Sequence, residues 1–144
     1  MAMIPKFRAW DREKDRMIYP STTGVCFEMN DDGISVLDID VDYPNDYGFP
    51  KIASILMQST GLKDKNGVEI FEGDVVSVSV RNGFDYLDNK VCIVKNSIDY
   101  SGLVCATVDE DLEYQIFNTE LFEEYTYEVI GNIYQNSELL EEQR

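Results

Sequence analysis

Residues 56–76 read LMQSTGLKDKNGVEIFEGDVV, and this stretch predicts short strands joined by tight turns. Asn66-Gly67 is a dipeptide that favours the positive φ angles of a two-residue hairpin loop, so we expect a tight turn over residues 64–67. Residues 68–71 are rich in apolar side chains and predict a short strand. Residues 72–74, Glu-Gly-Asp, predict a second turn directly after it.

The same alternation of short strands and turns is expected on both sides of this stretch. Runs rich in Val, Ile, Phe and Tyr alternate with Gly, Asp and Asn about every ten residues, which is typical of a mainly β fold. Val76, Val78 and Val80 alternate with polar residues, as expected when one face of a sheet is buried. The remaining strands are expected at residues 6–10, 16–19, 25–29, 34–41, 55–59, 91–94, 103–106 and 127–134.

Three local features refine this reading. Gly131 interrupts the last predicted strand and indicates a bulge. Residues 137–143 predict a short C-terminal helix, capped by Asn136 or Ser137 and with acids in its first turn. Residues 119–125 could also be helical but are too short for an assignment.

The domain organisation is expected to change near residues 43–51, the longest interruption, which contains Pro44 and Pro50. We therefore expect residues 1–50 to form an N-terminal β-hairpin extension. Residues 51–144 are expected to form the main body with the C-terminal helix. A chain of 144 residues is long enough for one domain with an appendage.

The charge balance excludes several classes of function. Twelve Lys and Arg face 28 Asp and Glu, for a net charge of −16. Binding to a nucleic-acid backbone or to an anionic membrane surface depends on cations, so neither is expected. The chain has no His, which removes imidazole acid–base chemistry and His-based zinc sites. An acidic solvated surface is the simplest interpretation, and a surface for a basic partner is the alternative.

No secretory signal or membrane-length apolar run is present, so a soluble, cytoplasmic protein is expected. The three cysteines, Cys26, Cys92 and Cys105, lie far apart and form no CxxC pair. We expect reduced thiols that pack as small apolar side chains.

Asp38-Ile39-Asp40-Val41-Asp42 is the most conspicuous acidic motif. Counted from Asp38, the sixth and twelfth positions of a calcium loop are Tyr43 and Phe49, where Gly and Glu are needed, so an EF-hand fails. In a strand Asp38, Asp40 and Asp42 would share one solvated face. A two-metal carboxylate site is the alternative interpretation.

The sequence contains no motif typical of a catalytic nucleophile. Ser59-Thr60-Gly61 has no histidine to act as a base, and neither a GxSxG motif nor a phosphate-binding glycine loop occurs. Lys63 and Lys65 are expected to be solvated residues of a turn. Trp10 and Tyr19 could stack on a ligand, although cross-strand packing is the expected role. We therefore predict no catalytic, cofactor-binding or metal-binding residue and no cofactor.

Several segments together resemble the YopX family of phage and prophage proteins. The resemblance lies in FRAWD at residues 7–11, MIY at 17–19, the whole of 56–76, VIGNIY at 129–134 and ELL at 138–140. Ser137 stands where many members have Pro. The family implies a β-rich protein with an SH3-like barrel in its second half, in the cytoplasm of a host bacterium. It brings no established activity and no catalytic residues.

Five motif residues could form a site or only turns: Gly61, Asp64, Gly67, Gly73 and Asp74. Gly adopts the unusual backbone angles that turns need, and the Asp side chain forms hydrogen bonds with the backbone of a turn. We expect a non-enzymatic module that binds an unidentified protein partner. An acidic decoy that imitates DNA and a carboxylate–metal hydrolase are the alternatives. Neither a nucleic-acid backbone nor a membrane is an expected partner, and a homo-oligomer is compatible with the sequence.

Overall fold

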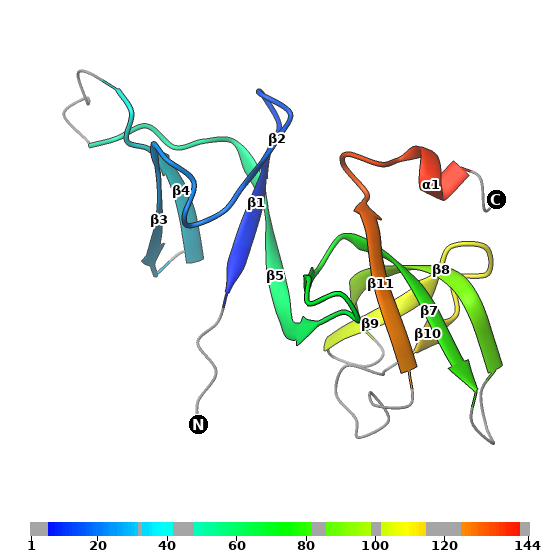
Figure 1. Ribbon diagram of the computed structural model, residues 1–144. Coiled ribbons are helices and arrows are strands. Elements are labelled where there is room, and N and C mark those ends of the chain that lie inside the picture. Colours follow the sequence, from blue (N-terminus) through cyan, green and yellow to red (C-terminus); the bar gives the residue numbers. More distant parts are fainter. Residues whose placement is uncertain are drawn as a thin grey trace. The chain divides into compact units, whose positions relative to one another are not determined.

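The computed structural model describes residues 6–31, 33–41, 48–81, 86–98, 102–114 and 125–141 (Figure 1). Within these ranges the chain forms eleven strands and one short helix. The expectation of a mainly β fold with a short C-terminal helix is confirmed. The chain divides into two compact units, and the boundary between them in the sequence lies between Gln58 and Ser59.

The unit Pro5–Gln58 contains two hairpins. They are formed by β1 (Phe7–Asp11) with β2 (Arg16–Ile18), and by β3 (Val25–Asn30) with β4 (Gly33–Asp38). The first half of β5 (Ser54–Lys63) pairs antiparallel with β1. Both predicted N-terminal hairpins are therefore present.

The core of this unit is small. Ala9, Ile18, Val25 and Val36 are buried together, and Phe27, Ile52 and Leu56 pack against them. Because Val25 and Val36 come from the β3–β4 hairpin, one face of that hairpin is anchored on the β1–β2 hairpin.

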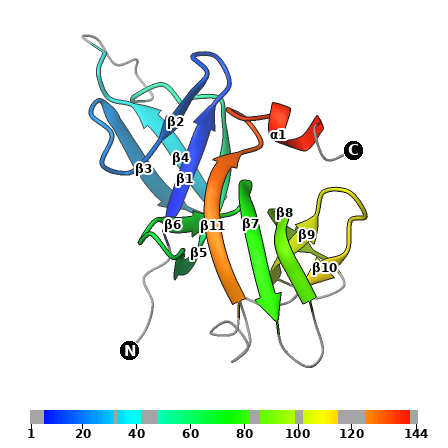
Figure 2. The ribbon, with the colours of Figure 1, turned by 45° about the vertical axis from the view of Figure 1, so that its right-hand side comes forward.

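The second unit begins at Ser59 and is built on a five-stranded antiparallel sheet. Its elements are β6 (Glu69–Phe71), β7 (Asp74–Arg81), β8 (Tyr86–Ser97), β9 (Gly102–Thr107), β10 (Glu113–Tyr114), β11 (Tyr125–Asn132) and α1 (Glu138–Glu141). The order in the sheet is β10-β9-β8-β7-β11, and the sheet curls into a half-barrel (Figure 2). The second half of β5 pairs with β6.

The predicted alternation on β7 is confirmed. Val76, Val78 and Val80 are buried, whereas Ser77 and Ser79 are half-buried. The three valines belong to one buried cluster with side chains from β6, β8, β9 and β11: Ile70, Cys92, Val94, Cys105, Tyr125 and Tyr127. This concave face is the core of the second unit.

The structure departs from the sequence-based elements in some places. β4 ends at Asp38, so residues 39–41 do not continue the strand that we expected to reach Val41. β11 begins at Tyr125, and residues 119–124 lie outside the described part, as do residues 42–47 of the expected interruption. The division into domains 1–50 and 51–144 stays a prediction.

Candidate functional site

Asp64 organises the turn between β5 and β6. Its side chain is only 8% exposed, and both carboxylate oxygens accept backbone hydrogen bonds. Oδ1 accepts from the amides of Asn66 (2.8 Å) and Val68 (2.9 Å), and Oδ2 accepts from Val129 (2.8 Å) on β11. The adjacent amide of Lys65 donates to the carbonyl of Tyr127 at 3.0 Å. This turn is therefore fastened to the outer edge of β11.

The electrostatics of Asp64 follow from these contacts. Burial alone would raise the pKa of the carboxyl, but the amides of Val129, Val68 and Asn66 outweigh it, and the pKa is lowered below the usual 3.8. An ionised carboxylate that is already engaged by three amides has little capacity left to accept a proton from a substrate. Asp64 thus serves the structure of the turn.

The turn itself differs from the predicted two-residue loop. The amide of Gly67 donates to the carbonyl of Asp64 at 3.0 Å, and that of Asp64 donates to the carbonyl of Val68 at 2.8 Å. Gly67 has φ of 82°, whereas Lys65 and Asn66 keep negative φ. This is the three-residue loop in which a turn is followed by a left-handed glycine, because the strand pairing closes at Val68.

Gly61 lies in a bulge of β5. The pairing of β5 with β6 shifts register between Ser59 and Lys63, and Gly61 has φ of 80°. The hydroxyl of Ser59 accepts the amide of Gly61 at 2.9 Å, and the hydroxyl of Thr60 donates to the carbonyl of Ile70 at 2.8 Å. The Ser-Thr-Gly triplet is therefore a bulge stabilised by its own hydroxyls.

Gly73 and Asp74 hold the turn between β6 and β7. Asp74 is 1% exposed, and its Oδ2 accepts the amide of Phe71 at 2.8 Å. The amide of Gly73 donates to Val94 at 2.7 Å, and its carbonyl accepts from Ile133 at 2.9 Å. The second predicted turn is confirmed, and it ties β8 to the segment after β11.

The end of β11 is a third hydrogen-bonded turn. The strand shifts register between Val129 and Gly131, which confirms the predicted bulge. The Oδ1 of Asn132 accepts the amides of Tyr134 (3.0 Å) and Gln135 (2.9 Å). The Oδ1 of Asn136 accepts the amide of Asn132 at 3.1 Å, so the Asn136 side chain is engaged here rather than on the helix.

A further buried acid was missed from sequence. Asp11 is 2% exposed at the end of β1; it accepts the amides of Glu13 and Lys14 and pairs with Arg16 Nε at 3.1 Å. Burial by itself raises the pKa of Asp11, but the Arg16 contact and the two amides lower it overall. Residues 11–15 were expected only to be a charged turn, and nothing local in the sequence marks Asp11 as buried.

The acidic motif at residues 38–42 does not form the expected row. Asp38 ends β4, Asp40 lies beyond the strand, and Asp42 is outside the described residues. Asp40 donates its backbone amide to Asp38 Oδ1 at 3.0 Å, which is a local turn contact. In the described ranges, no group of three or more Asp, Glu or Cys side chains is placed to hold a metal ion.

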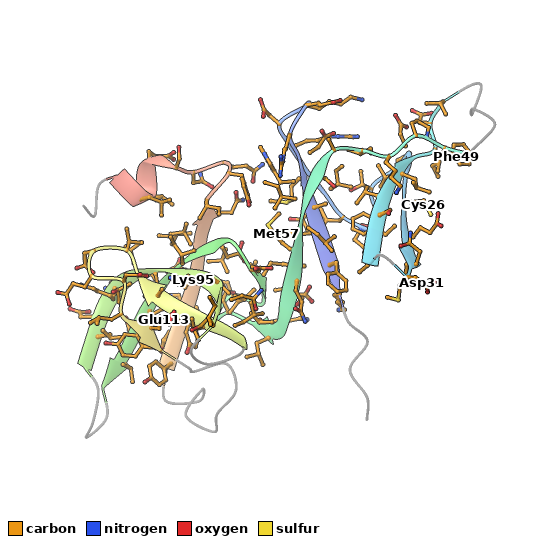
Figure 3. The ribbon with its side chains drawn as sticks, turned by 180° about the vertical axis from the view of Figure 1, so that it is seen from behind. Cys26, Asp31, Phe49, Met57, Lys95 and Glu113 are labelled. Carbon is orange, nitrogen blue, oxygen red and sulfur yellow. The ribbon has the colours of Figure 1, made fainter. Side chains whose placement is uncertain are left out.

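A charged cluster joins β8 to the β9–β10 hairpin. Lys90 pairs with Asp109, and Lys95 pairs with Asp111 at 2.8 Å and with Glu113 at 4.0 Å. Figure 3 shows Lys95 and Glu113 on this part of the second unit. The hydrogen bond that Lys95 Nζ donates to the Asp111 carboxylate raises the pKa of Lys95. These pairs depend on strand order, so sequence spacing could not reveal them.

The aromatic and thiol predictions have separate outcomes. Trp10 is 8% exposed and lies opposite Met17 and Ile55 in the sheet, so it packs as expected, whereas Tyr19 is 40% exposed. Cys92 and Cys105 are buried free thiols, as predicted. The prediction of a packed side chain is wrong for Cys26, which is exposed because it lies on the outer face of the β3–β4 hairpin.

The turns just described are built from the segments that carry the family resemblance. The chain matches the YopX protein family over residues 6–141. The chain belongs to the YopX family. Asp64, Gly67, Gly73 and Asp74 of this YopX-family chain all lie in the two turns that flank β6.

Two solved structures resemble this YopX-family chain over nearly all of its length. Protein EF1440 from Enterococcus faecalis has 27% sequence identity and a TM-score of 0.58, covering 96% of this chain and 99% of that chain. YopX from Bacillus subtilis has 21% identity and a TM-score of 0.58, covering 93% and 96%. At the latter identity the likeness shows the fold alone. No curated protein matches the chain.

The helical part of the YopX-family chain is brief. Among the described residues, no helix has the length and apolar character needed to span a membrane.

Proposed function

We propose that this YopX-family chain is a non-enzymatic module that binds a protein partner in the cytoplasm of a bacterium carrying a phage or prophage. The observation that carries the proposal is the use of Asp64 and Asp74 in the family motif. Both are buried and accept backbone amides, so the most distinctive polar residues are occupied in holding turns.

Exposed apolar side chains support a binding role. They occur in both units: Tyr19, Met29, Ile39, Phe49, Val68, Ile98, Leu112 and Ile130. Met29 is 74% exposed and Ile98 is 98% exposed. Single exposed apolar residues are common on soluble proteins, but they supply contact area for a partner when they flank a complementary surface.

The net charge of −16 favours a basic partner. Charge complementarity speeds encounter and excludes partners of the same sign. A DNA-mimicking decoy is the specialised form of this proposal, in which the partner is a DNA-binding protein and the acids occupy its DNA site.

Affinity capture from a bacterial lysate tests the proposal. We expect one protein to be retained in near-stoichiometric amount after nuclease treatment, with weaker retention as salt is raised. If that protein is released by duplex DNA in competition, the decoy form is correct. If the full chain retains no protein at any salt concentration, the proposal is contradicted.

A calorimetric titration with Ca²⁺, Mg²⁺ or Mn²⁺ tests the carboxylate–metal alternative. We expect no tight binding. A dissociation constant below about 10 μM that is lost in Asp40→Asn would favour a metal-dependent enzyme instead.

A further inference from the structure

Among the residues that the structure describes, the outer edge of β3 in the β3–β4 hairpin has no neighbouring strand. Pairs in this hairpin run from Asn30 opposite Gly33 to Val25 opposite Asp38. The carbonyl of Gly24 accepts the amide of Ile39 at 3.0 Å, so even-numbered residues of β3 are the ones that exchange hydrogen bonds with β4. The N–H and C=O groups of Val25, Phe27 and Met29 therefore point away from β4.

The two outer edges of this hairpin differ in their backbone hydrogen bonds to other parts of the chain. The outer edge of β4 is covered, because Val36 accepts the amide of Ile52 at 2.8 Å and Asp38 donates to Pro50 at 2.9 Å. Within the described ranges, β3 pairs with β4 and with no other strand. Edge strands are usually blocked by Lys, Pro or a bulge, and β3 has none of these.

The side chains on the two faces of β3 have different character. Val25 is buried at the base of the hairpin, Phe27 is half-buried, and Met29 is 74% exposed near the tip. Cys26, Glu28 and Asn30 alternate with them and are exposed. Figure 3 labels Cys26 on β3 and Asp31 in the turn. An added strand would thus have an apolar face beside Phe27 and Met29 and a polar face beside Glu28.

The charge of the sequence segment that contains this hairpin favours a basic occupant. Residues 17–50 contain no Lys or Arg. They contain the acids Glu28, Asp31, Asp32, Asp38, Asp40, Asp42 and Asp46. A second copy of the chain would bring the same negative charge to the edge, and like charges across paired strands are destabilising. A basic segment has the complementary charge.

We propose that β3 binds an extended basic segment of a partner protein, which adds to the hairpin as a further strand. In this segment apolar side chains alternate with Lys or Arg, so that the apolar ones contact Phe27 and Met29 while the cations face Glu28. Backbone hydrogen bonds to Val25, Phe27 and Met29 supply affinity, as in other cases of strand addition. This inference rests on the proposed function and locates its binding surface.

The probe is a synthetic peptide in which Lys alternates with Val. It has about ten residues, which is the length of a long strand. Amide hydrogen exchange is followed in the full chain with and without peptide. We expect exchange at Phe27 and Met29 to slow by about tenfold or more, because their outward amides become bonded. Exchange at Cys26 and Glu28, which already bond to β4, should change much less. Unchanged exchange at Phe27 and Met29 overturns the proposal.

Two variants at one position separate backbone from side-chain contributions. Met29→Pro removes an outward N–H without removing a bond to β4, and Met29→Ala keeps that N–H. Met29→Pro should weaken peptide binding about tenfold more than Met29→Ala does. Equal losses contradict strand addition. If Met29→Pro melts at a much lower temperature than the parent, the exchange result on the parent decides.

Control peptides test the charge. A peptide with Glu in place of Lys should not bind, and binding of the Lys peptide should weaken between about 0.1 M and 1 M salt. Equal binding of the Glu peptide overturns the basic occupant. Exchange protection that rises with protein concentration, without peptide, would assign the edge to a second copy instead.

Affinity capture with Met29→Pro distinguishes this inference from the proposed function. If Met29→Pro retains the same partner as tightly as the parent does, the β3 edge is not the surface, although the chain still binds a protein. If neither retains a partner, the proposed function itself fails.

Discussion

The side chain of Asp64 is hydrogen-bonded to the backbone of Val129, 65 positions later in the chain, with Oδ2 accepting the amide at 2.8 Å. The same carboxylate also accepts two amides from its own turn. One buried acid thus shapes the β5–β6 turn and fastens it to the last strand of the half-barrel.

Replacing Asp64 with Asn should therefore destabilise the chain. The amide group of Asn can present a donor to the Val129 amide, which leaves a buried N–H without its acceptor and costs about 1–3 kcal/mol. Urea unfolding measures the change. The control is the exposed Asp88→Asn, which should stay within about 0.5 kcal/mol of the parent. Equal stabilities of both variants would contradict the role of Asp64.

The same substitution should change the response to acid. The pKa of Asp64 and of Asp11 is lowered from 3.8 in the folded chain, so their contribution to stability is present above 3.8 and is lost as pH falls through the lower folded-state pKa. The stability difference between the parent and Asp64→Asn should therefore shrink on going from pH 7 to about pH 2. Comparing the two proteins at each pH removes the common effect of net charge. A difference that does not vary with pH would be evidence against the lowered pKa.

Gly67→Val should destabilise the fold through backbone strain alone. Gly67 has φ of 82°, and among the described residues no heavy atom beyond Gly67 and its two chain neighbours lies within 4 Å of the position that a Cβ would take. Holding a branched residue in this left-handed conformation costs about 1–2 kcal/mol or more. The melting temperature should fall by about 4 °C or more. Gly67→Asn, which tolerates this conformation, should retain most of the stability, and an unchanged Gly67→Val would show that the turn is not needed for folding.

Gly131→Ala should destabilise the end of β11 through a steric clash. A Cβ at Gly131 would lie 2.5 Å from Oδ1 of Asn136, the atom that accepts the amide of Asn132. The clash displaces that side chain and its hydrogen bond. Asn136→Gly removes the obstructing atoms, so adding Gly131→Ala to it should cost much less than in the parent. Additive losses in a double-mutant cycle would refute the clash.

Thiol labelling should distinguish Cys26 from the other two cysteines. Burial raises the pKa of Cys92 to about 12 and raises that of Cys105 as well, which keeps both as unreactive thiols. Cys26 is exposed. A thiol reagent at neutral pH should therefore modify Cys26 in the native protein and all three after unfolding. Rapid native labelling of Cys92 would contradict the buried position on β8.

The local features of this fold could be predicted from sequence because their causes are local. The alternation of Val76, Val78 and Val80 reflects the two faces of a strand, and Gly73 and Gly131 mark a turn and a bulge. The exact loop at Gly67 could not be predicted, because it depends on where Asp64 and Val68 close the pairing.

The tertiary structure alone decided which distant residues meet and which edge stays open. Asp64 is buried because the last strand of the sheet passes beside its turn, and Lys95 pairs with Glu113 because β8 and β10 flank β9. In the same way, within the described part of the chain, residues 50–52 bond to β4 and no strand pairs with the outer edge of β3. Sequence by itself determined the strands and turns, because these depend on neighbouring residues. Strand order and register arise from packing across the whole chain, and therefore only the tertiary structure determined the contacts between strands.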